Sequence, residues 1–181
     1  VILESTVGNG MVEPGEECDD GNTGAADGCS ASGSLEVVLN EIVPNPVGAD
    51  NAPQPGGAWV ELYNRAAYPV VVGAWMLYDV NDAHELSITA LNAEPATTTV
   101  AAGGHLQVFR NGDGDFELNN TGDTVRLYTG EIGAGGTLVD QFTWTTSIGS
   151  GEGLGRVPNG VGGWTDTCPT PAASNVAGPC P

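Results

Sequence analysis

Short apolar runs separated by glycine and proline dominate this chain from residue 35 onward. In one of these runs, the apolar Val125 and Leu127 alternate with polar or aromatic neighbours, the pattern of a strand with one face in a core. No long stretch has apolar residues at helical spacing. The pattern therefore predicts an all-β fold with strands at 37–43, 58–64, 70–79, 85–88, 105–110, 124–128 and 138–144.

An ordered series of short motifs, none of them specific alone, runs along the same part of the chain. It comprises Asn40-Glu41-Ile42, Trp59-Val60-Glu61-Leu62-Tyr63-Asn64, the run 73–79, the run 116–127, Val139-Asp140, the run 155–160 and the run 170–175. In order and spacing this series resembles the lamin-tail domain, an immunoglobulin-like β-sandwich, over about residues 36–176. The resemblance implies the fold and, because a fold does not fix a function, only a class of functions.

The charge balance narrows the choice of partners. Four arginines and no lysine stand against 23 acidic residues, which gives a net charge of -19. Such a surface repels phosphate backbones and anionic membranes, so we expect no nucleic-acid binding. No apolar run approaches the roughly 20 residues of a membrane-spanning helix, so we expect no membrane insertion. A divalent cation or a cationic partner is what this surface attracts.

Four cysteines lie in polar, loop-like surroundings, two near each end of the chain: Cys18, Cys29, Cys168 and Cys180. An even number in such loops favours two disulfides and a secreted, extracellular or cell-surface protein. Four cysteines allow three pairings. We prefer Cys18 with Cys29 and Cys168 with Cys180, because each pair closes a short loop.

Composition divides the chain into three parts. Residues 1–34 hold an apolar opening strand, led by Val1, Ile2 and Leu3, and a Gly- and Asp-rich arm that has too few apolar residues for a core of its own. Residues 35–176 form the predicted sandwich, and residues 177–181 a short tail. The opening strand pairs either with the sandwich edge of its own chain or with another chain.

The arm carries a second resemblance. Cys18-Asp19-Asp20-Gly21-Asn22, followed by Asp27-Gly28-Cys29, is similar to a short disulfide repeat of secreted myxobacterial proteins, although the flanking cysteines expected near Val7 and Gly33 are absent. If the two flanking cysteines of the repeat normally bond to each other, their joint absence here leaves the Cys18–Cys29 bond intact. Hard oxygen ligands closed in one loop predict a Ca²⁺ site; the alternative is a set of solvated turn residues. The predicted ligands are Asp19, Asp20, Asn22 and Asp27.

A second candidate Ca²⁺ loop contains Asn111, Asp113 and Asp115. These residues resemble the first half of an EF-hand loop, but Phe116 stands where such a loop needs glycine. Asn-Gly and Asp-Gly are also hairpin-turn dipeptides, so the turn interpretation weighs as much as the metal interpretation.

No catalytic residues are predicted. Carboxylates that recur in lamin-tail domains could do acid–base chemistry, but the interpretation as polar groups that satisfy the backbone or pair with arginine is stronger. His84 and His105 stand alone in the sequence, and no serine lies in a nucleophile-elbow motif. The interpretation of the tryptophans as core or rim packing is preferred to a platform on which carbohydrate stacks. The residues concerned are Glu41, Glu61, Asp79, Asp123, Asp140 and Arg156, with Trp59, Trp75, Trp144 and Trp164.

These observations predict a secreted, non-enzymatic structural or adhesive module. A more specific version of this prediction makes the protein a calcium-stabilised filament subunit, which donates its N-terminal strand to a neighbouring subunit. Its partners are then copies of itself or another extracellular protein. The alternative is an accessory surface- or carbohydrate-binding domain of a secreted hydrolase, since bacterial lamin-tail domains often stand beside such enzymes.

Overall fold

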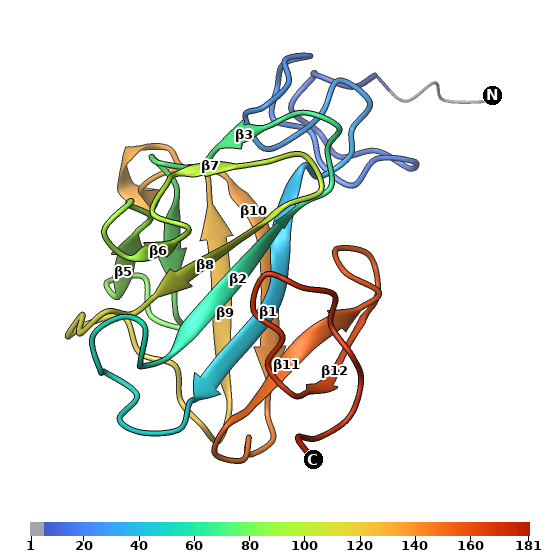
Figure 1. Ribbon diagram of the computed structural model, residues 1–181. Coiled ribbons are helices and arrows are strands. Elements are labelled where there is room, and N and C mark those ends of the chain that lie inside the picture. The colour runs from blue at the N-terminus through green and yellow to red at the C-terminus, as the bar shows by residue number, and fades with distance from the viewer. Residues whose placement is uncertain (1–5) are drawn as a thin grey trace.

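Two antiparallel sheets face each other in the computed structural model, which describes residues 6–181 (Figure 1). The predicted assembly residues Val1, Ile2 and Leu3 lie outside the described residues. The larger sheet has the order β12-β11-β1-β2-β8-β6 and the smaller the order β10-β9-β4-β5, while β3 pairs with β7 alone. The strands are β1 Val37–Asn45, β2 Trp59–Asn64, β3 Val70–Val71, β4 Met76–Tyr78, β5 Glu85–Ser87, β6 Ala93–Glu94, β7 Thr99–Val100, β8 His105–Phe109, β9 Asp123–Tyr128, β10 Leu138–Trp144, β11 Glu152–Val157 and β12 Gly163–Thr167, with a 3-10 helix η1 at Ile132–Ala134.

The core fills the space between the sheets and follows the predicted alternation. Val125 and Leu127 of β9 are fully buried, and their neighbours along the strand are half-buried. They pack in one cluster with Leu39, Leu62 and Leu106 of the larger sheet. The fold class is thus confirmed as an all-β, immunoglobulin-like sandwich with a disulfide-closed arm.

The predicted strand 70–79 is wrong as one element. It is divided into β3 and β4, because the chain turns where Trp75 N donates to the Val72 carbonyl at 3.0 Å. This turn lets the first half pair with β7 and the second half with β9.

Strands β11 and β12 complete the larger sheet beyond the predicted set. β11 pairs with β1 although two of its six residues are glycines, which are poor strand formers. A Cβ on Gly155 would come within 2.6 Å of Asn175 Nδ2, and one on Gly153 within 2.9 Å of a Val43 methyl. Glycine therefore permits the close approach of the chain to β1 and to the C-terminal segment.

The single described helix, η1, has three residues, so nothing in the described part of the chain has the length and apolar character of a membrane-crossing helix.

Candidate binding site between the arm and the sandwich

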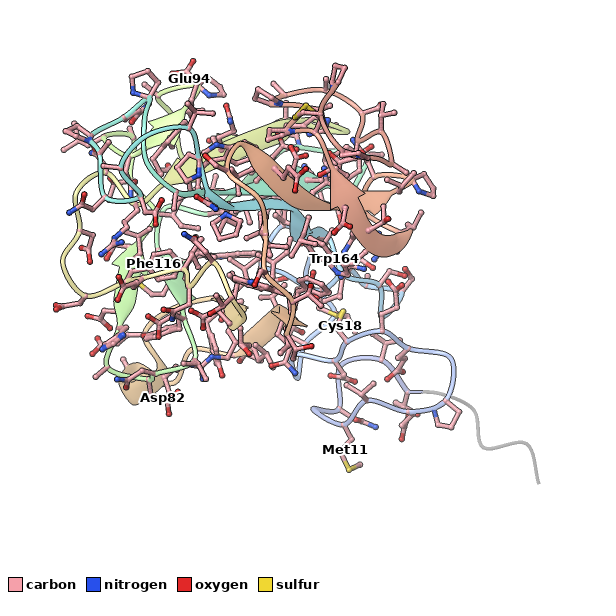
Figure 2. All side chains as sticks on the ribbon, turned by 90° about the horizontal axis from the view of Figure 1, so that it is seen from below. Met11, Cys18, Asp82, Glu94, Phe116 and Trp164 are labelled. Atoms are coloured by element: carbon pink, nitrogen blue, oxygen red, sulfur yellow. A yellow bond between two sulfur atoms is a disulfide. The ribbon has the colours of Figure 1, made fainter. Side chains whose placement is uncertain are left out.

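The arm is closed by one disulfide and the C-terminal segment by the other. Cys18 and Cys29 are joined with a Cα–Cα distance of 5.9 Å, and Cys168 and Cys180 with one of 4.5 Å. Both predicted local pairings are confirmed. In Figure 2, Cys18 lies where the arm meets the sandwich, and Met11 points away from the sandwich at the tip of the arm.

Asp19 organises the inside of the arm. Its carboxylate accepts four backbone N–H groups, from Gly8, Gly10 and Gly21 at 2.8 Å and from Asn9 at 3.1 Å. Desolvation acts to raise the pKa of Asp19, but these bonds hold that pKa below its usual value. The four donors occupy the oxygens that a cation would need, so the described contacts give Asp19 a structural role.

The other three predicted arm ligands lie together. Asn22 Nδ2 donates to Asp27 Oδ2 at 3.2 Å, and Asn22 N donates to Asp20 Oδ1 at 3.2 Å. Burial, and then the negative charge of Asp27, raise the pKa of Asp20. Among the described residues, no three His, Cys, Asp or Glu side chains are grouped as a metal site. Calcium binding by the arm stays a prediction, resting on Asp20, Asn22 and Asp27.

Glu36 fixes the arm to the sandwich, a role that the sequence did not predict. Its buried carboxylate accepts N–H groups from Ala26 at 2.8 Å and Gly28 at 3.0 Å, and the hydroxyl of Tyr68. The bond to Glu36 raises the pKa of Tyr68 to about 12. The only feature of the sequence that indicates this role is a single acidic residue, Glu36, directly before the apolar run that begins β1.

A groove of about 590 Å³ lies between the arm and one end of the sandwich. The arm lies beside β3 and the start of β1 (Figure 1). The sandwich side of the groove carries the apolar Val71, Trp75 and Leu138 beside two threonines, while the arm side carries the carboxylates of Asp20 and Asp27. Folding thus places two carboxylates that have no described arginine partner next to apolar side chains.

The second candidate metal loop is a turn held by its own side chains. Asp113 Oδ1 accepts N–H groups from Asp115 and Phe116, both at 2.9 Å. Asn111 has a left-handed φ of 52° and accepts the N–H of Gln54 at 2.9 Å. Two of the three predicted ligands therefore hold the loop, which favours the turn interpretation, and calcium binding here stays a prediction.

The region that carries the sandwich has a counterpart among known families. The model of the Lamin Tail Domain family matches residues 30–146, which contain β1 to β10. The chain belongs to the lamin tail domain family. No curated protein and no solved structure matched the chain. The predicted repeat in the arm precedes the matched region and stays a prediction.

In this lamin tail domain the five carboxylates hold loops to the sandwich, as their structural interpretation predicts. Asp140 pairs with Arg156 at 3.1 Å and accepts the N–H of Leu39. Asp123 accepts the N–H of Asn119, and Asp79 that of Glu117.

Glu41 and Glu61 tie the C-terminal segment to the outer face of the larger sheet. Glu41 accepts Thr167 Oγ1 at 2.9 Å and Thr170 N at 3.0 Å, and Glu61 accepts Ala172 N at 2.7 Å. Both carboxylates are fully buried. Burial, with the charge of Glu61 as a smaller contribution, raises the pKa of Glu41 to about 7.

The histidines are not solitary, which corrects the expectation from the sequence. His105 Nδ1 lies 2.8 Å from Glu61 Oε1, and His84 Nδ1 lies 2.8 Å from Asp79 Oδ2. Strand pairing decides the first contact, because β8 lies beside β2 in the sheet. The second ring nitrogen of each lies near an asparagine amide, Asn159 and Asn81 respectively, and no described hydroxyl or thiol bonds to it.

The tryptophans of this lamin tail domain pack rather than form a platform. Trp59, Trp75 and Trp144 are at most 7% exposed. Trp164 stacks on Phe142 with ring centroids 4.0 Å apart, and the guanidinium of Arg156 lies 5.0 Å from the Trp164 centroid. None of the four therefore offers an open face to a sugar ring.

Proposed function

We propose that the protein is a secreted, non-enzymatic adhesive module in which the lamin tail sandwich is the scaffold and the arm is the binding part. The use of the buried carboxylates carries this proposal. Glu36, Glu41 and Glu61 each hold one segment of chain against the sandwich. Groups committed in this way are poor candidates for acid–base chemistry, which needs a carboxyl within reach of a substrate. Two disulfides support an oxidising, extracellular location.

A calcium-stabilised filament built by strand donation is the finer form of this proposal. Strand donation needs a sheet edge with free backbone groups. The longest edge strand described is β10, but its register shifts between Leu138 and Asp140, and Gln141 N donates to Asp140 Oδ1. Such irregularities protect an edge against pairing. The adhesive form therefore has more support than the filament form.

The accessory domain of a secreted hydrolase is the second candidate function. The groove supports it, since acidic groups next to exposed apolar side chains suit a second protein better than another copy of this acidic chain. A carbohydrate ligand has less support, because the tryptophan faces are covered.

Mass in solution tests these functions. Light scattering after size exclusion, with Ca²⁺ and with a chelator, separates a monomeric binding module from a polymer. In the filament form, deleting residues 1–6 abolishes the polymer. Unchanged fibres from the truncated chain in negative stain contradict strand donation.

Hydrolysis assays test the absence of catalysis. We expect no turnover of p-nitrophenyl acetate or bis(p-nitrophenyl) phosphate above the buffer rate. The His105→Ala and His84→Ala variants are matched controls, because each removes one histidine–carboxylate pair. A turnover that disappears in a folded histidine variant would overturn the non-enzymatic assignment.

A further inference from the structure

The groove between the arm and the sandwich combines two features that together suit a binding partner. The first is exposed apolar surface around a concavity. Val12, Val71 and Leu138 are 61%, 60% and 41% exposed, and all three line the groove. Covering such surface releases ordered water, so a partner with apolar side chains is stabilised there.

The second feature is negative charge without an arginine partner among the described residues. Glu17 in the same groove is neutralised by Arg65 at 2.9 Å, and Asp19 is bonded to backbone N–H groups. Asp20 and Asp27 pair with no arginine of the described chain, and each accepts only one of the hydrogen bonds from Asn22, both at 3.2 Å. Every arginine of the protein has another partner: Arg65 pairs with Glu17, Arg110 with Glu117, Arg126 with Asp82 and Arg156 with Asp140.

We propose that this groove binds an extended segment of a different protein, in which a lysine or arginine side chain lies between apolar side chains. The basic group meets Asp20 and Asp27, and its apolar neighbours cover Val71 and Leu138. The proposal deepens the adhesive function above, on which it rests, by stating the chemistry of the partner.

A second copy of this chain does not fit the same groove. The chain has no lysine, its four arginines are engaged, and its net charge is -19. Two such chains repel each other at long range, whereas a basic partner is drawn in. Ca²⁺ alone is also a poor occupant of the groove. It prefers six to eight oxygen ligands, and it leaves the apolar side chains of the groove exposed to water.

The test uses the whole protein and a labelled nonapeptide, Gly-Ser-Leu-Val-Lys-Leu-Val-Ser-Gly, with its Lys→Gln counterpart as the matched probe. Fluorescence anisotropy gives Kd for each. We expect the lysine peptide to bind about tenfold more tightly than the glutamine peptide, and its affinity to fall with added salt. Amide NMR shifts at Gly28 and Leu138 locate the bound peptide.

Paired variants separate the groove from general charge. Asp20→Asn with Asp27→Asn weakens the lysine peptide about tenfold, whereas Glu94→Gln with Asp166→Asn, which removes the same charge from exposed sites elsewhere, leaves Kd unchanged. Leu138→Ser weakens both peptides, because it removes apolar wall and no charge.

Three results would overturn the proposal: no binding of the lysine peptide, equal weakening by both double variants, or Ca²⁺ binding lost in Asp20→Asn with Asp27→Asn without any peptide binding. These results leave the non-enzymatic assignment intact, since only a catalytic turnover overturns that one.

Discussion

Glu41 makes the stability of this protein depend on pH in a direction that can be worked out. Its carboxyl is fully buried beside Glu61, and burial raises its pKa from 4.5 to about 7. The folded state therefore holds a proton that the unfolded state releases. The stabilisation is fully present below about pH 4.5 and is lost as the pH rises through 7.

The magnitude follows from the two pKa values. One pKa unit corresponds to about 1.4 kcal/mol, so full ionisation of Glu41 costs about 3 kcal/mol. Roughly 2 to 3 kcal/mol of this is lost between pH 5 and pH 8. Glu41→Gln removes the titration while keeping the shape, because a glutamine oxygen accepts Thr170 N and its amide donates to the Thr167 hydroxyl.

The assay is urea unfolding followed by tryptophan fluorescence without reductant, at several pH values from 5 to 8. We expect wild type and Glu41→Gln to differ little at pH 5, and the variant to be more stable by about 2 to 3 kcal/mol at pH 8. Glu94→Gln is the control, since an exposed side chain meets nearly the same solvent in the folded and unfolded chain. A difference between wild type and Glu41→Gln that stays constant across this range refutes the reasoning.

Two further predictions concern the arm. Asp19→Ala leaves four backbone N–H groups without their acceptor, so we expect amide exchange at Gly8, Gly10 and Gly21 to accelerate severalfold, with little change at β9. Unchanged exchange contradicts the role of Asp19. If the arm binds Ca²⁺, the midpoint of thermal unfolding rises with Ca²⁺ and falls with a chelator by mass action, and a midpoint that does not move excludes both predicted calcium sites.

Local signals explain which strands were predictable. Strands such as β9 alternate apolar and polar residues, and that pattern survives in any fold with one buried face. β11 was missed because its place is decided by contact with β1 and Asn175, where glycine is needed for close approach rather than for strand propensity. The pattern does not predict the division of 70–79 into β3 and β4, because the apolar run continues through the turn at Trp75.

The candidate site was predictable only in part. The local disulfides and the turn at Asp113 follow from residues close in sequence. The role of Glu36, the histidine–carboxylate pairs and the groove depend on residues far apart. For example, His105 and Glu61 are 44 positions apart and meet only because β8 pairs with β2.

The sequence by itself determined the class of fold, the net charge and the local disulfides, because periodicity and short loops involve neighbouring residues and net charge depends on composition alone. The tertiary structure decided which carboxylates hold loops and which have no arginine partner and line the groove. Asp19 and Asp20 are adjacent in the chain, yet one is enclosed by backbone N–H groups and the other faces an apolar wall. Only the packing of the arm on the sandwich makes that difference.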